Sequence, residues 1–433
     1  MRDNKTDVIV VGGGPAGISC AITIARAGKQ VVLIERGKFA GSKNVFGGAI
    51  YAQPTREIFP DFEKTAPIER KTVEHKFALL GEDDGTVISY KEKPDENASY
   101  SVIRGKFDRW MAEEAQKEGV ILVEETVVKD LLLDKGYVVG VRTEIEEYYA
   151  DIVVLADGVN SLLARQIGLR NTITPEDVAL SVKEVYKLPE NIINERFHVT
   201  SDEGCIYEIF GGPMLGMLGL GFLYTNKNSV SIGLGVTLSE LVKKSLRPYE
   251  LLDKLKLHPE IAPLLKDGEL LEYSAHLIPE GGFKKIPKII GNGVMICGDA
   301  AMLVNNMHWE GTNLAMISGK LAGETAVIAL GKNDFSENSL IRYADELENS
   351  FIIKDLRTYK DLMSGIGARA SHFLEYYPQK INSFFKMFTT TDSTPKRQNY
   401  RKFIKSIFTD RKFTDLPKDA WCAIKLLWSI LIK

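Results

Sequence analysis

The sequence lacks closely spaced cysteines, and this excludes the metal sites that are built from CxxC pairs. Its four cysteines are Cys20, Cys205, Cys297 and Cys422, and even the nearest two, Cys205 and Cys297, are 92 positions apart. Structural zinc sites and iron–sulfur clusters need several ligands at short spacing. We therefore expect no metal centre built from this chain alone, and the cysteine pattern suits a reducing cytoplasm.

Long hydrophobic runs are also missing. No apolar stretch approaches the roughly 20 residues that a membrane-spanning helix needs, although 44% of the residues are hydrophobic. The chain enters a predicted strand by Val8, which leaves no room for a signal peptide. We therefore expect a cytoplasmic protein with no segment that crosses a bilayer.

Net positive charge is confined to the end of the chain, and the rest of the chain is net acidic. Residues 380–433 hold twelve Lys/Arg and four Asp/Glu, a net charge of +8, so the remainder carries −11. Residues 416–432 place lysines and tryptophans at helical spacing, which predicts a helix lying in the lipid headgroup layer. There are two alternatives: this tail docks onto the rest of the chain, or it docks onto a protein partner. We expect no nucleic-acid partner.

The pattern of buried runs predicts an α/β protein with a parallel sheet. Residues 8–11 and 31–35 are unbroken apolar strands around a helix over 15–27, as a sheet covered on both faces requires. Residues 152–156 and 293–297 repeat the buried-strand signature, and residues 108–119 predict an amphipathic helix. Short glycine-rich alternating segments from about 171 to 290 instead predict an antiparallel sheet.

We therefore expect a discontinuous Rossmann-like cofactor domain that contains an inserted antiparallel-sheet substrate domain and is followed by a basic, amphipathic helical tail. The expected cofactor domain comprises residues 1–75, 101–172 and 290–372. The expected substrate domain comprises residues 76–100 and 173–289, and the expected tail comprises residues 373–433.

The stretch "VIVVGGGPAGISCA" carries the GxGxxG spacing between the first strand and the first helix. Gly12 and Gly14 allow a tight turn and close approach to a pyrophosphate, and Gly17 allows the helix to pack against the strand. Pro15 and Ala16 complete the helix start. Glu35 ends the second strand, where a carboxylate accepts hydrogen bonds from ribose hydroxyls. Together these features predict a dinucleotide site.

Three later features favour FAD over NAD. Asp157–Gly158 and Gly298–Asp299 each end a buried strand, and Arg104 precedes a helix. Because FAD is elongated, it needs polar partners along its ribityl chain, and Asp299 is suited to accept from a ribityl hydroxyl. "GTN" then opens another helix whose free N–H groups suit the flavin ring. The predicted residues of this last element are Gly311, Thr312 and Asn313.

A second GxGxxG motif and a redox CxxxxC motif are both absent from the sequence. Enzymes that take electrons from NAD(P)H through a dedicated nicotinamide domain carry the first, and many carry the second. We therefore expect a protein electron donor, such as an electron-transfer flavoprotein. Transient binding of a nicotinamide at the flavin face remains an alternative.

These motifs, in this order, resemble the FAD-binding fold of para-hydroxybenzoate hydroxylase and its relatives. "GSKNVFGGAIY" (41–51), "HLIPEGG" (276–282) and "NNMHWEGTNLAMISGKLAGE" (305–324) are most similar to one branch. This branch is the electron-transfer flavoprotein:quinone oxidoreductase family, in its bacterial FixC form. The resemblance implies that Asn44, Gly47 and Gly48 approach the isoalloxazine ring. It also implies a quinone pocket walled by the inserted sheet domain.

The family resemblance further implies partners and a location. Mitochondrial-type members end in a ferredoxin-like cluster domain, whose cysteines this chain lacks. The FixC form instead works with a separate ferredoxin-like protein, FixX, and with electron-transfer flavoprotein subunits of the FixA and FixB type. The implied complex carries out flavin-based bifurcation. A quinone substrate implies peripheral association with the inner face of the cytoplasmic membrane.

Two further sets complete the predicted site. His308 and Glu310 flank Trp309 just before "GTN", where they are suited to gate protons for quinone reduction. A pair that only caps or supports the turn is the alternative. Arg36, directly after Glu35, and Val128, in the next strand region, are predicted to contact the cofactor.

Three functions compete on the sequence. The first is an FAD-dependent oxidoreductase that passes electrons from an electron-transfer flavoprotein to a quinone. The second is a geranylgeranyl-reductase-like enzyme that hydrogenates isoprenoid double bonds. The third is a non-catalytic flavoprotein scaffold in an electron-transfer complex. The "GSKNVFGGAIY" stretch and the missing cysteines favour the first.

Overall fold

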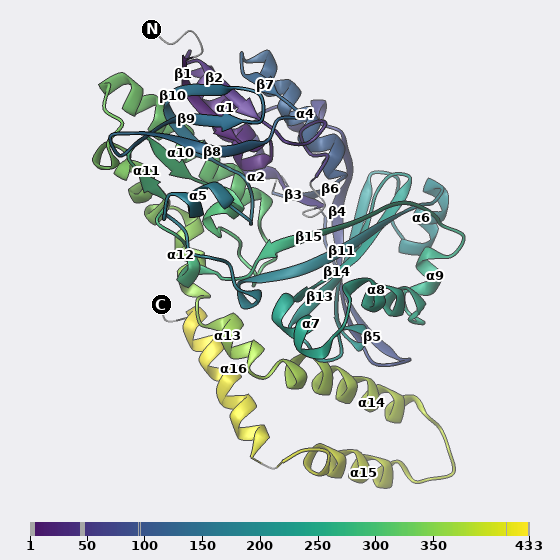
Figure 1. Cartoon of the computed structure of the whole chain (residues 1–433). Coiled ribbons are helices and arrows are strands. Elements are labelled where there is room, and N and C mark those ends of the chain that lie inside the picture. The colour runs from purple at the N-terminus through teal and green to yellow at the C-terminus, as the bar shows by residue number, and fades with distance from the viewer. Residues whose placement is uncertain (1–4, 44–47, 94, 96, 413, 432–433) are drawn as a thin grey trace. The chain divides into compact units, whose positions relative to one another are not determined.

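The chain forms two units, each built from three segments of the sequence (Figure 1). The computed structural model describes residues 5–43, 48–93, 95, 97–412 and 414–431. Unit 1 comprises Met1–Lys71, Pro94–Val178 and His276–Arg357. Unit 2 comprises Thr72–Lys93, Ala179–Ala275 and Thr358–Lys433. The expected fold class, a discontinuous α/β cofactor domain with an inserted antiparallel sheet and a helical C-terminal region, is confirmed.

The sheet of unit 1 is built around parallel strands that are buried along most of their length. Its order is β16-β17-β10-β1-β2-β7, and the neighbours from β17 to β7 pair in parallel. β8 and β9 extend it as an antiparallel hairpin on β10. The strands are β1 (Lys5–Val11), β2 (Val31–Ile34), β7 (Ile121–Val123), β8 (Val128–Asp134), β9 (Tyr137–Thr143), β10 (Glu147–Leu155), β16 (Ile290–Gly291) and β17 (Val294–Ile296).

Helices α1 (Pro15–Arg26) and α10 (Thr312–Lys332) pack closely against each other in unit 1. Their contact is made by small residues: a Cβ atom placed on Gly319 would lie 2.0 Å from the carbonyl oxygen of Ala16. A Cβ atom placed on Gly323 would lie 2.8 Å from the carbonyl oxygen of Cys20. These glycines therefore let the two helix backbones approach more closely than side chains permit.

The remaining elements of unit 1 surround this core. Two short antiparallel strands pair with each other, and one of them also pairs with the first residues of β4. These elements are β3 (Ala49–Tyr51), β6 (Ser99–Val102), α2 (Ala52–Arg56), α3 (Phe62–Thr65), α4 (Arg104–Lys117), α5 (Leu162–Gln166), α11 (Glu337–Asn349) and α12 (Phe351–Thr358), with short turns η1 (Pro175–Asp177), η3 (Phe283–Lys285) and η4 (Gly298–Ala301).

Unit 2 contains an antiparallel sheet with helices packed on one face. Its strands follow the order β15-β11-β14-β13-β12-β4, with β5 on β4. They are β4 (Ile68–Leu80), β5 (Gly85–Lys91), β11 (Val178–Lys187), β12 (Glu203–Gly211), β13 (Gly219–Thr225), β14 (Ser229–Thr237) and β15 (Glu269–Pro279). Alternate side chains such as Val182, Tyr207, Leu223 and Ile232 join an apolar core with the helices. The helices are α6 (Glu190–Phe197), α7 (Leu238–Lys244), α8 (Pro248–Leu257) and α9 (Ala262–Leu265), with the short turn η2 (Gly212–Met214).

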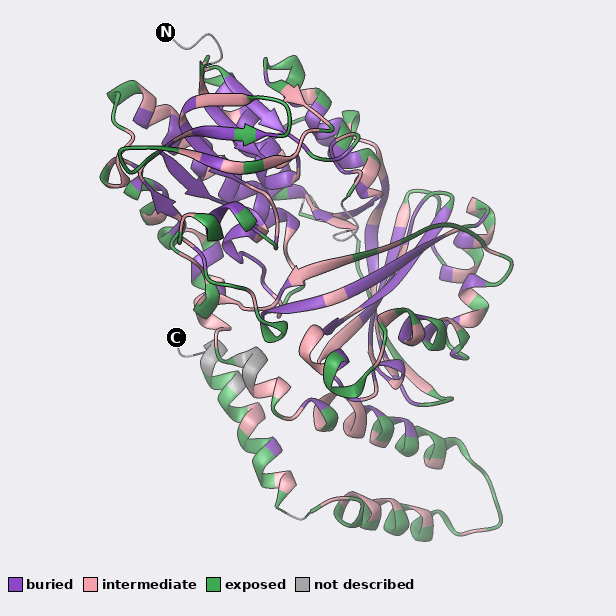
Figure 2. Cartoon of the chain, viewed as in Figure 1, coloured by how far each residue is buried: buried purple, intermediate pink, exposed green. Residues whose placement is uncertain are grey.

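The end of the chain forms a string of helices in unit 2. They are α13 (Leu362–Gly367), the π-helical turn η5 (His372–Tyr376), α14 (Tyr377–Thr389), α15 (Lys396–Thr409) and α16 (Asp415–Leu431). Figure 2 shows that α14, α15 and α16 are far more exposed than the sheets. Among their described side chains only Pro378, Asn382 and Asp419 are buried. The predicted tail helix over 416–432 is present as α16 as far as Leu431, and Ile432 lies outside the described residues.

One expectation about a helix boundary needs correction. The helix expected over 108–119 begins at Arg104, because Arg104 is buried and pairs with Asp108 one turn later inside the helix. Sequence patterning treats such an arginine as a loop residue. In addition, α10 meets the length and composition of a membrane span, but 61% of its most apolar window is buried. Its packing against α1 identifies it as a core helix.

Candidate functional site

Most of the predicted cofactor residues meet at one edge of the unit 1 sheet. Val11 is in register with Ile34 of β2 and Leu155 of β10, and Leu155 is in register with Ile296 of β17. The chain therefore leaves four neighbouring parallel strands at the same level. Gly12, Glu35, Asp157 and Gly298 follow these strand ends within one or two residues. In open α/β sheets, ligands bind outside the carboxyl ends of the strands.

The glycine-rich loop after β1 has no room for side chains. Gly12 has a φ of +109°, and a Cβ atom placed on it would lie 2.3 Å from the carbonyl oxygen of Ala156. A Cβ atom placed on Gly17 would lie 1.9 Å from the carbonyl oxygen of Gly12. Gly14 caps α1 without a side-chain hydrogen bond, and Pro15 takes the first helical position. The first-turn amides of α1 are therefore free to bind a pyrophosphate.

Glu35 holds this loop through both of its carboxylate oxygens. Its Oε2 accepts a hydrogen bond from the amide of Gly13 at 2.8 Å, and its Oε1 accepts from the amide of Gly37 at 2.6 Å. The side chain is buried. Each carboxylate oxygen has a second lone pair, so the residue can still accept from a ribose. The sequence predicted the ribose role but not this structural one.

A second acidic position follows β10. Burial raises the pKa of Asp157 to about 6, against the opposing effect of hydrogen bonds and of Arg170. Its Oδ1 has no hydrogen-bond partner among the described residues. Gly158 has a φ of +75°, and the space next to it is open. A buried acceptor without a donor, beside open space, fits a ligand hydroxyl.

Asp299 lies in the η4 turn after β17, between two arginines. Burial raises the pKa of Asp299 to about 6, and Arg104 and Arg170 oppose this shift. Arg104 also makes two hydrogen bonds with Asp108, at 2.8 and 2.7 Å, and reaches Thr312 Oγ1 at 3.4 Å. Gly298 has a φ of +63°, and its amide donates to Ser318 Oγ at 3.0 Å. Arg104 therefore links the η4 turn to the start of α10.

The start of α10 offers unsatisfied polar groups. Gly311 caps the helix, and Thr312 and Asn313 form its first turn. In the described part of the chain, Asn313 Oδ1 lacks a hydrogen-bond partner although the residue is buried. Like Asp157 Oδ1, it is a buried acceptor that a ligand can satisfy, and the N-termini of α1 and α10 favour negative charge. The residues present thus fit FAD, from pyrophosphate to ring.

His308 and Glu310 lie just before α10 but face different surroundings. His308 is exposed, whereas Glu310 is partly buried. Burial raises the pKa of Glu310, against the effect of His308. The backbone of Glu310 pairs with that of Asn305 through hydrogen bonds of 2.9 and 3.1 Å. These contacts close the turn before α10, which favours the supporting role over proton gating.

Of the other predicted residues, some lie in the part of the chain that the structure describes and some lie outside it. Asn44 and Gly47 lie outside the described residues. Gly48 accepts a hydrogen bond from the amide of Val102 at 2.7 Å, next to β3. Arg36 is exposed directly after Glu35, and Val128 is the first residue of β8.

Sequence reasoning missed three residues, of which Arg170 and His276 interact electrostatically with predicted site residues. Arg170 is buried, donates to the carbonyl oxygen of Ala300 at 3.1 Å, and burial lowers its pKa. Burial and the charges of Arg104 and Arg36 lower the pKa of His276. Burial raises the pKa of Glu280 to about 8. His276 and Glu280 do fall in the "HLIPEGG" stretch, the one signal that could have indicated them.

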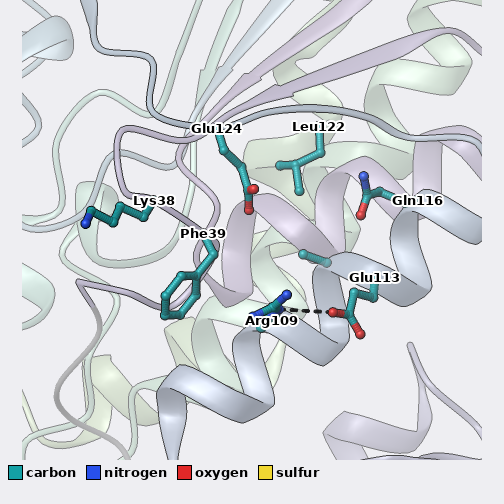
Figure 3. Close-up of a pocket in the computed structure, with 8 residues that line it drawn as sticks. Lys38, Phe39, Arg109, Glu113, Gln116, Leu122 and Glu124 are labelled. Atoms are coloured by element: carbon teal, nitrogen blue, oxygen red, sulfur yellow. Dashed lines mark hydrogen bonds and ion pairs between the residues drawn. The ribbon is translucent and has the colours of Figure 1, made fainter.

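A separate pocket lies on α4 and the segments beside it (Figure 3). Arg109 Nε donates to Glu113 Oε1 at 3.1 Å, and its guanidinium lies over the ring of Phe39 at 5.6 Å. None of the predicted cofactor residues lines this pocket. Its lining residues are Lys38, Phe39, Arg109, Ala112, Glu113, Gln116, Leu122 and Glu124.

Three family models match the chain in succession. Residues 5–200 match an FAD binding domain. Residues 178–278 match the ubiquinone-binding domain of ETF-QO, the electron-transfer flavoprotein:quinone oxidoreductases. Residues 363–428 match the C-terminal domain of the ETF-QO/FixC family. The first match confirms the prediction of FAD as the cofactor.

Curated relatives match almost the whole chain. Protein FixC of Bradyrhizobium diazoefficiens is 40% identical over 429 residues, covering 97% of this chain and 98% of the relative. The probable electron transfer flavoprotein-quinone oxidoreductase YdiS of Escherichia coli is 38% identical over 409 residues, covering 93% and 95%. A geranylgeranyl bacteriochlorophyll reductase-like structure from Thermoplasma acidophilum has a TM-score of 0.71, covering 94% and 97%, but only 20% identity, so it shows the fold alone. The chain therefore belongs to the ETF-QO/FixC family of FAD-dependent oxidoreductases.

Proposed function

We propose that this chain takes electrons from an electron-transfer flavoprotein and delivers them to a quinone. The observation that carries the proposal is the match of residues 178–278, the sheet of unit 2, to a ubiquinone-binding domain in a chain whose other unit binds FAD. When bound, FAD exchanges one or two electrons and so joins a one-electron donor to a two-electron acceptor. The backbone amides of α1 and the acids Glu35, Asp157 and Asp299 hold the cofactor in place.

The cysteine distribution supports a separate carrier for any iron–sulfur cluster. No two of the four cysteines are close in sequence, and no group of three or more His, Cys, Asp or Glu side chains suited to a metal occurs in the described ranges. We therefore propose a ferredoxin-like partner of the FixX type, with FixA- and FixB-type subunits as donor. In such a complex the chain takes part in electron bifurcation.

The proposed activity predicts a visible redox cycle. Anaerobic protein mixed with a reduced electron-transfer flavoprotein should lose its flavin absorbance band, and a short-chain ubiquinone should restore it. FAD-free protein serves as the control and should transfer no electrons to the quinone. If the flavin stays oxidised with this donor, alone and with a FixX-type ferredoxin, the assignment of the donor is wrong. If reduced protein never reacts with quinone, the assignment of the acceptor is wrong.

The C-terminal helices support contact with a membrane surface. α16 exposes Trp421, Ile424, Leu427 and Trp428, each more than half exposed. α14 adds Phe384, Phe385 and Phe388, and α15 adds Tyr400, Ile404 and Phe408. These apolar side chains stand in a region of net charge +8. Apolar side chains with surrounding lysines suit the interface of an anionic bilayer, where the quinone is dissolved.

Removing the exposed tryptophans should release the chain from lipid. Trp421→Ala with Trp428→Ala should lower partitioning onto phosphatidylcholine–phosphatidylglycerol vesicles about tenfold or more, since each lost ring removes about 1.5–3 kcal/mol of apolar burial. Co-sedimentation measures this. A matched control changes Tyr249 and Leu257, exposed on α8, to alanine and should leave binding intact. If the tryptophan variant binds vesicles as well as the wild type does, a protein partner rather than lipid is the surface that these helices contact.

A further inference from the structure

The unit 2 sheet has a second face, opposite the helices, that carries an unusual row of side chains. Glu208, Phe222, Gly233 and Lys183 stand directly opposite one another on the adjacent strands β12, β13, β14 and β11. None of them belongs to the apolar core that joins the sheet to its helices. All four lie within the residues that match the ubiquinone-binding domain. The row is therefore part of the unit proposed to hold the quinone.

Glu208 and His75 form a hydrogen-bonded pair in this row. His75 Nδ1 on β4 lies 3.0 Å from Glu208 Oε1. The side chain of Glu208 is only 8% exposed, whereas that of His75 is 36% exposed. Within the described part of the chain, Glu208 Oε2 has no hydrogen-bond partner. The pair thus connects solvent to a buried carboxyl oxygen that has no partner of its own.

Aromatic rings lie beside this carboxyl group. The rings of Phe222 and Tyr224 stack with their centroids 4.8 Å apart and their planes inclined by 20°. A Cβ atom placed on Gly233 would lie 2.4 Å from Phe222 Cζ, so the Phe222 ring covers the glycine. Phe222 is buried and Tyr224 is partly exposed, so a flat ring would stack on Tyr224. A quinone head group here would have a carboxyl group within the same row.

A second buried acid shows what a purely structural carboxylate looks like in this sheet. The Oε2 atom of Glu184 accepts from Tyr186 at 2.7 Å and pairs with Lys256 of α8 at 2.9 Å. Among the residues that the structure describes, Glu208 hydrogen-bonds through its side chain to His75 alone. A buried carboxyl group is costly unless its oxygens are satisfied. The second oxygen of Glu208 therefore differs from the carboxylate of Glu184 in being available to a ligand.

We propose that Glu208 donates protons to the carbonyl oxygens of the bound quinone and that His75 returns protons to Glu208 from solvent. This inference rests on the proposed function. Reduction of a quinone to a quinol consumes two electrons, supplied by the reduced flavin, and two protons. Each proton leaves the carboxyl group of Glu208 for a quinone oxygen, and His75 then protonates the carboxylate and takes a proton from water.

The electrostatics of the pair suit this relay. The hydrogen bond with Glu208 raises the pKa of His75, burial opposes the shift, and the charges of Glu208 and Glu92 add to it. A histidine with a raised pKa stays protonated to higher pH and can reprotonate its partner at neutral pH. Other titratable groups on the elements packed around the pair are Glu74, Lys76, Tyr90, Lys91, Tyr207, Tyr224 and Glu375.

The experiment compares an acceptor that takes up protons with one that does not. Protein with photoreduced FAD is mixed anaerobically with a short-chain ubiquinone or with ferricenium, and flavin reoxidation is followed across pH. Glu208→Gln should slow reoxidation by quinone roughly 100-fold, as loss of a general acid does, and should leave reoxidation by ferricenium unchanged. Glu208→Asp should recover part of the rate. In His75→Gln, the rate of flavin reoxidation by quinone should fall at high pH, where the wild type remains active.

Matched variants distinguish loss of the relay from general damage to the sheet. Glu184→Gln removes a buried acid from another strand of the same sheet and should leave the quinone-to-ferricenium rate ratio at the wild-type value. If quinone reoxidises the wild type and Glu208→Gln keeps the wild-type ratio of quinone to ferricenium rates, the relay is wrong but the proposed function stands. Wild-type protein that quinone cannot reoxidise would overturn the proposed function and the relay together.

Discussion

We expect the Gly319→Ala variant to bind FAD weakly and to lose most of its bound cofactor. The new methyl group would lie 2.0 Å from the carbonyl oxygen of Ala16, 2.8 Å from its carbonyl carbon and 3.1 Å from its Cα. These are backbone atoms in the first turn of α1, so α10 must move away from α1. Such overpacking costs about 1–3 kcal/mol of folding free energy. It also displaces two helix starts that hold the cofactor, so we expect the FAD affinity to fall at least about tenfold.

The same helix provides the control. Gly331 also lies in α10, but nothing lies within 4 Å of a Cβ atom placed on it. Gly331→Ala should therefore raise the free energy of unfolding by about 0.5–1 kcal/mol, since alanine favours a helix over glycine. Flavin titration of the apoprotein and thermal unfolding measure both variants. Full FAD binding by Gly319→Ala would show that the α1–α10 spacing does not control the site.

Asp419→Asn is expected to free α16 from the rest of unit 2. Asp419 is 2% exposed and binds Arg369 and Arg411, and it also accepts from Tyr377 at 2.9 Å. His372 Nδ1 lies 3.0 Å from the same carboxylate. A neutral asparagine removes the counter-charge of Arg411 and leaves Arg369 only its longer contact with Asp415, at 3.6 Å. Breaking a buried ion pair in this way costs about 3–5 kcal/mol. Proteolysis and hydrogen exchange of residues 414–431 should both accelerate.

Asp410 offers the same chemical change at the surface. It pairs with Lys380 at 2.5 Å, but its side chain is 47% exposed. Asp410→Asn should therefore change stability by no more than about 1 kcal/mol. If both variants keep α16 equally protected, the Asp419 cluster does not hold the helix.

The pH dependence of this cluster has a definite sign. Burial would raise the pKa of Asp419, but hydrogen bonds from His372, Arg369, Tyr377 and Arg411 outweigh it and lower the pKa to about 2. The folded-state pKa thus lies below the unfolded value of about 3.9. Its contribution to stability is present above that value and is lost as the pH falls through about 2.

Local motifs predicted the parts of the site that depend on backbone shape. Gly12 and Gly17 reveal their role through spacing alone, because only glycine fits a helix start pressed against a strand end. Asp157 and Asp299 could be identified because each ends an apolar run, where a carboxylate is conspicuous. Glu35 was identified for the same reason, although its hydrogen bonds to Gly13 and Gly37 were not.

Residues whose role depends on tertiary burial could not be predicted. Arg170 and Glu208 look like ordinary surface charges in the sequence, and only the packed sheets show that they are buried. In the tail helix, the spacing of lysines and tryptophans suggested an interfacial helix and gave no sign of an inward-facing acid. The structure instead turns Asp419 inward and brings Cys422 Sγ within 3.7 Å of the carbonyl oxygen of Gly365. Which side of an amphipathic helix docks is decided by its neighbours, not by its own period.

The strand order of unit 1 has a consequence for synthesis on the ribosome. β1 emerges early, yet its neighbour β10 ends at Leu155, and β17, which pairs with β10, ends at Ile296. A nascent chain shorter than this lacks Asp299 and all of α10, so it has no complete cofactor cradle. One edge of β1 has no strand to pair with until β10 has been synthesised. Such an unpaired edge favours binding by chaperones. Flavin capture therefore comes late, only after the start of α10 at Thr312, when about 72% of the 433 residues have been made.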